Sequence, residues 1–323
     1  MVQGGPAIQL GVVVATILGL WIGARFLVDA VVRLAQRFGL SDLTIGLTVA
    51  AMGTSTPELM VSLDATYKGL GNIAVANVLG SNIYNLAFIL GVIALLRALP
   101  VAASVLDRDG IVLLLATAVG GVAILDLTVT RLEGAALVCL FVAYTAVLLR
   151  TTSAQSPTDD TPAGEAATSA LTRRVAFRGR DAVLLLSGLA LVLVSGDSMV
   201  LAASALARSA GISEWVIGGT IIAAGTSTPE FAVSLVALKR GSLGVSVGNV
   251  VGSNVFNIVG ILGLAALVRP LAVHPTAIET LAWLAVITVL VVAALWTDRV
   301  LSRREGALFT CSEILRWIVG IVG

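Results

Sequence analysis

Long apolar stretches alternate with short polar ones along most of the chain. A helix rises 1.5 Å per residue, so about 20 apolar residues cross the roughly 30 Å hydrocarbon layer of a bilayer. Ten stretches fit this requirement, the last one interrupted by Ser312, Glu313 and Arg316. They lie at about 7–36, 42–66, 72–97, 108–126, 132–150, 181–208, 214–238, 244–269, 274–297 and 305–322. The pattern predicts an all-α polytopic membrane protein with ten transmembrane helices.

The stretch 151–180 departs from this pattern, because it is rich in Ser, Thr, Pro, Ala and charged residues. Such a composition cannot bury enough apolar surface to fold alone. We therefore expect a linker that separates residues 1–150, with five predicted spans, from residues 181–323, with the other five.

The two halves are related by an internal repeat. Residues 41–90 aligned with 213–262, at a constant shift of 172 positions, are identical at 25 of 50 places. Each half holds an odd number of spans, so the second half must enter the membrane from the opposite side. Inverted repeats of this kind are typical of secondary transporters.

Basic residues give the expected orientation. In the ten-span arrangement fourteen Lys or Arg residues fall on one side of the membrane and four on the other. Cytoplasmic loops carry the excess of positive charge. We therefore expect the linker in the cytoplasm, both termini outside, and the chain in the plasma membrane.

Composition agrees with the membrane assignment. Hydrophobic residues make up 58% of the chain, charged residues 12%, and the mean hydropathy is +1.02, outside the range of soluble domains. A net charge of +1 gives no reason to expect a nucleic-acid partner. Cys139 and Cys311 are themselves 172 positions apart, so the repeat explains them better than a disulfide does.

One motif places an acid inside an apolar span in both halves. Gly53-Thr54-Ser55-Thr56-Pro57-Glu58 recurs as Gly225-Thr226-Ser227-Thr228-Pro229-Glu230. Proline has no N–H to donate, so the helix should break, with Thr56 as N-cap of a second half-helix that carries Glu58 in its first turn. Irregular backbone survives at membrane depth only where protein, water or an ion satisfies it.

A second repeated motif supplies neutral oxygens. Gly80-Ser81-Asn82-x-x-Asn85 recurs as Gly252-Ser253-Asn254-x-x-Asn257, and Ser81 and Asn85 share a helix face. If the halves meet, they gather two carboxylates, serine hydroxyls, amides and carbonyls. Such an all-oxygen set suits Ca²⁺, Na⁺ or Mg²⁺. Two buried carboxylates need a compensating cation. One divalent ion or several monovalent ions could fill the same pocket, and this competition is a physical basis for antiport.

Other interpretations are open at this point. Small residues and Asn also serve tight helix packing, so the second motif alone does not decide for ion binding. A cation channel would also gather oxygens at mid-membrane, although paired broken helices fit an occluded site better. A structural or receptor-like membrane protein would not need the two buried acids.

At these two motifs the sequence resembles the Ca²⁺/cation antiporter superfamily, and within it the prokaryotic sodium/calcium exchangers. The resemblance covers nearly the whole chain. It implies exchange of Ca²⁺ for Na⁺ by alternating access, without a cofactor, and we expect a functional monomer. It also implies that the first and sixth spans are long helices that slide against the other eight.

The resemblance further implies a ligand set. Glu58 and Glu230, with the carbonyls of Thr54 and Thr226, would bind Ca²⁺. Flanking Na⁺ sites and the central position would be completed by Ser55, Ser227, Ser81, Ser253, the carbonyls of Ala51 and Ala223, Asn85 and Asn257. Many relatives carry Asp at the place of Asn257 or of both amides. With only two carboxylates here, K⁺ co-transport is not expected, and H⁺/Ca²⁺ antiport at the same glutamates is the alternative to Na⁺ coupling.

Overall fold

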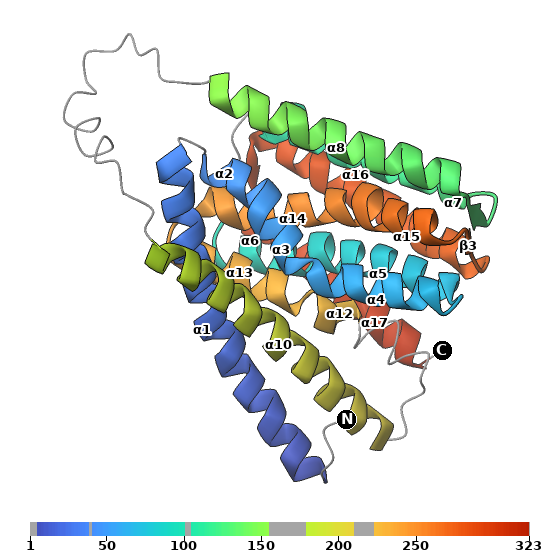
Figure 1. Cartoon of the computed structure of the whole chain (residues 1–323), viewed down its shortest axis with the longest axis horizontal. Coiled ribbons are helices and arrows are strands. Elements are labelled where there is room, and N and C mark those ends of the chain that lie inside the picture. Colours follow the sequence, from blue (N-terminus) through green and yellow to red (C-terminus); the bar gives the residue numbers. More distant parts are fainter. Residues whose placement is uncertain (1–4, 39–40, 101–104, 155–178, 210–222, 323) are drawn as a thin grey trace.

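The computed structural model describes residues 5–38, 41–100, 105–154, 179–209 and 223–322 (Figure 1). In the first half the α-helices are α1 (Pro6–Phe38), α2 (Asp42–Ile45), α3 (Ala51–Thr54), α4 (Thr56–Tyr67), α5 (Gly71–Ile83), α6 (Leu90–Leu96), α7 (Ile111–Ile124) and α8 (Arg131–Ala154). Three π-helical segments are inserted among them, η1 (Gly46–Ala50), η2 (Tyr84–Ile89) and η3 (Val105–Gly110).

The described part of the second half has a similar order. Its helices are α10 (Gly179–Ser209), α12 (Ala223–Thr226), α13 (Thr228–Lys239), α14 (Leu243–Val255), α15 (Leu262–Val268), α16 (Thr276–Asp298) and α17 (Arg303–Val322), with the π-helical segment η5 (Phe256–Ile261). From α3 to α6 and from α12 to α15, each element has the same bounds at a shift of 172 residues. The internal repeat of the sequence is therefore also a repeat of local structure.

Six helical stretches in the described part of the chain are long and apolar enough to cross a membrane. They are Pro6–Ala30, Gly71–Leu96, Arg131–Arg150, Gly179–Met199, Leu243–Val268 and Thr276–Thr297. The chain is therefore a mostly helical membrane protein. The start of the predicted span at 214–238 and most of the 151–180 linker lie outside the described residues.

The described part of the chain also contains four two-residue strands that were not predicted. Strand β1 (Leu99–Pro100) pairs antiparallel with β4 (Val300–Leu301), and β2 (Thr128–Val129) pairs with β3 (Leu271–Ala272). The shift of 172 carries β1 onto β3 and β2 onto β4, so each ribbon joins the two halves and one ribbon is the repeat of the other. Two residues per strand leave no alternating pattern that sequence analysis could detect.

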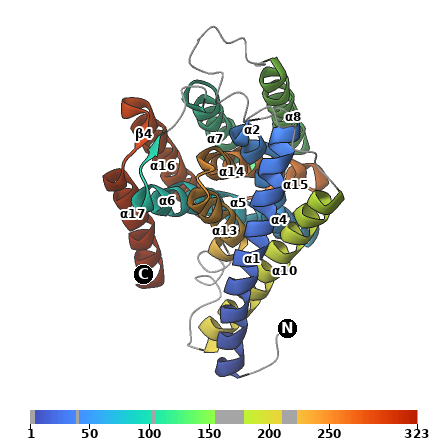
Figure 2. The same ribbon diagram turned by 90° about the vertical axis from the view of Figure 1, so that its left-hand side faces the viewer.

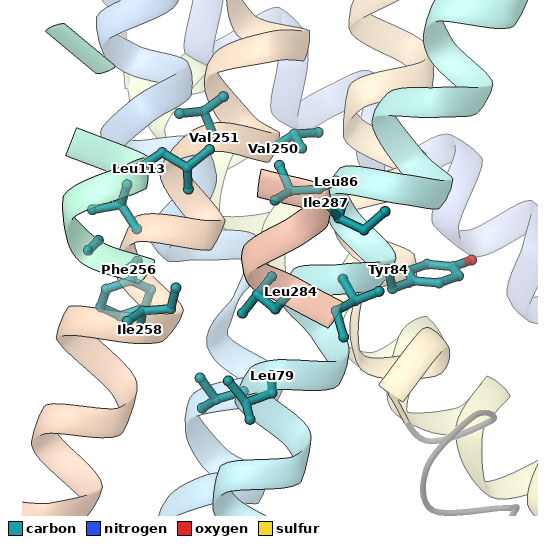
Figure 3. Packing of buried hydrophobic residues seen from close by; sticks show 14 of the residues in the cluster. Leu79, Tyr84, Leu86, Leu113, Val250, Val251, Phe256, Ile258, Leu284 and Ile287 are labelled. Atoms are coloured by element: carbon teal, nitrogen blue, oxygen red, sulfur yellow. The ribbon is translucent and has the colours of Figure 1, made fainter. Parts of the chain in front are cut away.

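The main hydrophobic core lies between the π-helical segments and the helices around them. Leu86, from η2, and Ile258, from η5, are buried there with Leu79, Leu284 and Ile287 (Figure 3). Both halves therefore contribute to one continuous core. Polar residues of the two repeated motifs, including Glu58 and Glu230, are buried as well.

Helices α1 and α10 form a separate pair beside this core. They run side by side and cross the other helices obliquely (Figures 1 and 2). Their backbones approach closely at two glycines, because a Cβ on Gly23 would lie 2.9 Å from the carbonyl oxygen of Gly188. Small residues permit this kind of contact between membrane helices. The pair shares a second, smaller hydrophobic cluster that includes Leu20, Leu27 and Val192.

Candidate functional site

The predicted helix break is present in both halves. Ser55 separates α3 from α4 with φ −80° and ψ 13°, and Ser227 separates α12 from α13 with φ −85° and ψ 6°. Pro57 and Pro229 stand in the first turn of the helix that follows. The missing proline N–H interrupts the main-chain hydrogen bonding of the helix at one residue. Helices α4 and α13 follow the break, each with a glutamate in its first turn.

The predicted cap was wrong. Thr56 is already helical, and its Oγ1 donates to the carbonyl oxygen of Met52 at 3.2 Å. Thr228 does the same toward Ala224 at 3.0 Å. Ser55 bends the chain only slightly, so the next threonine hydroxyl reaches back to the preceding turn instead of forward to free N–H groups.

Glu58 and Glu230 are completely buried, and each carboxylate accepts a hydrogen bond from a serine of the other half. Ser55 Oγ donates to Glu230 Oε1 at 2.7 Å, and Ser227 Oγ donates to Glu58 Oε1 at 2.9 Å. The serine that breaks the helix in one half thus binds the carboxylate of the other half. The structure brings both predicted carboxylates into one site between the repeats.

The threonines and alanines before each break line the same region. Thr54 and Thr226 are buried, and their hydroxyls donate to carbonyls of their own helices, Thr226 to Ala223 at 3.1 Å. Thr54 Oγ1 reaches Ala51 O at 3.3 Å. The Ala51 carbonyl also accepts from Ser253 Oγ at 3.5 Å, which places this main-chain oxygen beside a serine of the second motif.

The serines of the second motif differ between the halves. Ser253 Oγ lies 3.4 Å from Glu230 Oε1. Ser81 Oγ lies 3.5 Å from Thr226 Oγ1, and no hydrogen bond joins it to Glu58 within the described residues. Both serines have no exposed surface. The structure therefore brings both serines to the site, but only Ser253 directly contacts a carboxylate.

The two predicted amides lie in the π-helical segments. Asn85 is the second residue of η2 and Asn257 the second of η5. Both side chains are fully buried. Asn257 Nδ2 donates to Asn82 Oδ1 at 3.0 Å. The π-helical turn holds an extra residue, a local distortion frequent at functional sites, and it was not predicted.

Several buried oxygens have no hydrogen-bond partner among the described residues. They are Glu58 Oε2, Glu230 Oε2, Asn85 Oδ1, Asn254 Oδ1 and Asn257 Oδ1. Buried polar atoms normally have partners, and an unpaired buried carboxylate oxygen is costly. A cation with oxygen ligands would satisfy such atoms and neutralise the two acids. The residues present therefore fit a hard cation as the cargo of this site.

Four residues that sequence analysis did not select join the site. Asn77 and Asn249 are buried and hydrogen-bonded to the main chain of Glu58 and Glu230, respectively. Ser62 and Ser234 bind the same two amides. All four are identical across the 172-residue shift. That identity was the available signal, but it did not separate site residues from packing residues.

Two of the charged residues that interrupt the last apolar stretch, Glu313 and Arg316, form an ion pair on α17. Arg316 Nε donates to Glu313 Oε2 at 2.7 Å, and Trp317 Nε1 donates to Glu313 Oε1 at 2.7 Å. The carboxylate is 1% exposed, so it is compensated inside the protein and not at its surface. This explains how an apolar helix tolerates both charges.

Two buried acids, two broken helices and a shell of neutral oxygens inside a helical membrane protein define the class of ion-binding membrane transporters. Comparison with known proteins gives the family. The model of the sodium/calcium exchanger protein family matches residues 8–150 and 181–312. The chain belongs to this family and is a membrane antiporter of cations.

Individual relatives agree. The chain is 38% identical over 259 residues to the putative antiporter CaxA of Alkalimonas amylolytica, covering 80% of each chain. It is 29% identical over 281 residues to the sodium/calcium exchanger MaX1 of Methanosarcina acetivorans, covering 78% of this chain and 80% of MaX1. A solved structure of the sodium-calcium exchanger NCX_Mj, soaked with Na⁺ and Sr²⁺, superposes with a TM-score of 0.81 at 30% identity. It covers 96% of this chain and 98% of NCX_Mj.

Proposed function

We propose that this chain exchanges Ca²⁺ for Na⁺ across the membrane, with Glu58 and Glu230 as shared ligands of one Ca²⁺. The observation that carries the proposal is the pair of unpartnered Oε2 atoms on two fully buried carboxylates. Their Oε1 atoms are already held by Ser227 and Ser55. One divalent cation would balance both charges at once.

Neutral oxygens around the carboxylates would complete the ligand sets. The proposal gives the carbonyls of Thr54 and Thr226 to Ca²⁺, and Asn85 and Asn257 to the central position. Na⁺ would be bound at flanking positions by Ser55, Ser227, Ser81 and Ser253, together with the carbonyls of Ala51 and Ala223. The burial of these residues around the two breaks supports this assignment.

Charge balance makes the coupling testable. Two carboxylates with one Ca²⁺ are neutral, whereas three or more Na⁺ leave a positive site, because Asn85 and Asn257 cannot ionise. Translocation with Na⁺ bound should therefore carry charge. An inside-positive potential should accelerate Ca²⁺ uptake driven by outward Na⁺ movement.

We further propose ten transmembrane helices in two inverted five-helix repeats, residues 1–150 and 181–323, joined by a cytoplasmic linker at 151–180. In this arrangement both termini lie outside and the protein functions as a monomer in the plasma membrane. The repeated elements and the two ribbons β1–β4 and β2–β3 support the inversion. The fourteen-to-four distribution of basic residues supports the orientation.

The decisive experiment is ⁴⁵Ca²⁺ uptake into proteoliposomes that contain the purified protein. One set is loaded with Na⁺ and diluted into Na⁺-free buffer, and a matched set carries only a pH gradient. We expect uptake in the first set and its stimulation by an inside-positive potential. Uptake driven by the pH gradient alone would replace Na⁺ coupling by H⁺/Ca²⁺ antiport, and single-channel currents would indicate a channel.

A further inference from the structure

Two buried asparagines outside the proposed ligand set connect the repeats in a matching way. Asn77 lies on α5 and Asn249 on α14, 172 positions apart. They are 5% and 0% exposed. Each one lies beside the glutamate-bearing helix of its own half and the helix break of the other half. The hydrogen bonds of the two asparagines can therefore be compared directly.

Both hydrogens of each amide are used within its own half. Asn77 Nδ2 donates to the main-chain oxygen of Glu58 at 3.1 Å and to Ser62 Oγ at 3.0 Å. Asn249 Nδ2 donates to the main-chain oxygen of Glu230 at 3.3 Å and to Ser234 Oγ at 3.1 Å. The first bond fixes the backbone from which the glutamate projects, and the second fixes the rotation of the amide.

The amide oxygens reach the opposite half. Asn249 Oδ1 lies 3.1 Å from Thr54 Oγ1, and Asn77 Oδ1 lies 3.5 Å from Thr226 Oγ1. Each hydroxyl has one hydrogen, which it shares between the amide oxygen and carbonyls of its own half. Thr54 and Thr226 are the last residues before the two breaks. Each asparagine therefore joins the glutamate of one repeat to the break of the other.

The chemistry of this position requires an amide. A side chain of this length must donate twice and accept once, and among the standard residues only Asn provides two N–H donors and a carbonyl at that reach. Asp would lack the donors, and Leu would remove both donors from buried oxygen acceptors at a cost. Packing alone would not demand this exact donor and acceptor pattern in both halves.

We propose that Asn77 and Asn249 are positioning residues for ion binding, which set the spacing between the carboxylates by holding each glutamate backbone against the opposite helix break. The inference rests on the proposed function, since it assumes that Glu58 and Glu230 bind the cation. Neither asparagine is a ligand in this account. Their loss should weaken cation binding without preventing the protein from folding.

A double-mutant cycle tests the proposal, with Ca²⁺ and Na⁺ binding to purified protein measured as the shift of the melting temperature with ion concentration. Asn249→Ala and Thr54→Val remove the two sides of one hydrogen bond. We expect each to weaken Ca²⁺ binding about tenfold, and the double variant to be about as weak as either single one. Thr54→Val combined with Asn77→Ala, which breaks two different bonds, should multiply the losses to about a hundredfold.

Thr288→Ala is the matched control for truncating a buried polar side chain. Thr288 is fully buried, and among the described residues its hydroxyl bonds only to Leu284 of its own helix. We expect it to leave ion affinity unchanged. If Asn249→Ala does not fold, Ser234→Ala should give about a threefold loss of affinity, because it removes the hydroxyl that orients the amide and also donates to the Ser246 carbonyl oxygen.

Two results would overturn the proposal. One is unchanged affinity in both asparagine variants, with a melting temperature lowered as in Thr288→Ala, which would make the asparagines purely structural. The other is multiplied losses in both Thr54 pairs. Wild-type protein that binds neither Ca²⁺ nor Na⁺ would contradict the proposed function itself and remove the basis of the inference, so the two failures are distinguishable.

Discussion

Glu58 and Glu230 stand at equivalent places in the two halves, yet their surroundings differ. Glu230 Oε1 accepts from Ser55 and lies within 3.4 Å of Ser253 Oγ, whereas Glu58 Oε1 accepts from Ser227. The same residue types therefore make a tighter network around the second glutamate. A repeated sequence fixes which groups are available, and the packing between the halves decides which of them touch.

The largest effect is expected from neutralising either glutamate, and it should be the same for both despite their different surroundings. Each glutamate supplies half of the negative charge, so Glu58→Gln and Glu230→Gln should reduce Ca²⁺ transport equally, by about a hundredfold or more. Flux of ⁴⁵Ca²⁺ into proteoliposomes measures this. The ion-free variants should melt no lower than the wild type, because an uncompensated buried charge has been removed. Normal transport by either variant would exclude that glutamate from the site.

The two central amides offer a sharper contrast. Asn257 Nδ2 donates to Asn82, so Asn257→Asp would place a carboxylate against a carbonyl oxygen. Both polar side-chain atoms of Asn85 lack a partner among the described residues, so Asn85→Asp breaks no bond there. Asn257→Asp should therefore cost about 1–3 kcal/mol more in stability. Thermal unfolding in detergent compares the two, and equal melting temperatures would contradict the difference.

The serines of the second motif should also be unequal. Ser253→Ala removes a contact to Glu230 and one to the Ala51 carbonyl. Ser81→Ala removes a contact to Thr226. A buried hydrogen bond contributes about 0.5–1.5 kcal/mol, so we expect Ca²⁺ affinity to fall about tenfold in the first variant and about twofold in the second. If Ca²⁺ titrations showed a larger loss of affinity for Ser81→Ala than for Ser253→Ala, the asymmetry of the structure would not be the one that governs ion binding.

The smallest expected effect lies at the periphery. Asp29, on α1, forms an ion pair with Arg240, after α13, and both side chains are about one-third exposed. At the shift of 172 residues Asp29 corresponds to Leu201, and Arg240 corresponds to Lys68. Lys68 pairs with Asp64 instead. Asp29→Leu should change stability by about 0–1 kcal/mol, and less at high salt. A large change in Ca²⁺ affinity would show that this contact is coupled to the site.

Much of the site was predictable because its chemistry is local. Pro57 and Pro229 mark the breaks, and their glutamates follow directly in the chain. The contacts of Ser55 with Glu230 and of Asn249 with Thr54 join residues 175 and 195 positions apart. Those contacts depend on how the halves pack, which no short motif specifies.

The fold was predictable to a similar degree. The apolar stretches locate the long helices, because crossing a bilayer requires a minimum length of apolar residues. The π-helical segments that carry Asn85 and Asn257 were not predicted. Their residues read as ordinary helix in the sequence, so the distortion could not be foreseen.

Equilibrium binding of ⁴⁵Ca²⁺ to the purified protein tests the central claim most directly. Two carboxylates that share one ion predict one Ca²⁺ per chain, displaced by Na⁺, and loss of that binding in both Glu58→Gln and Glu230→Gln. Two independent Ca²⁺ ions per chain, with one retained in each single variant, would contradict a shared site.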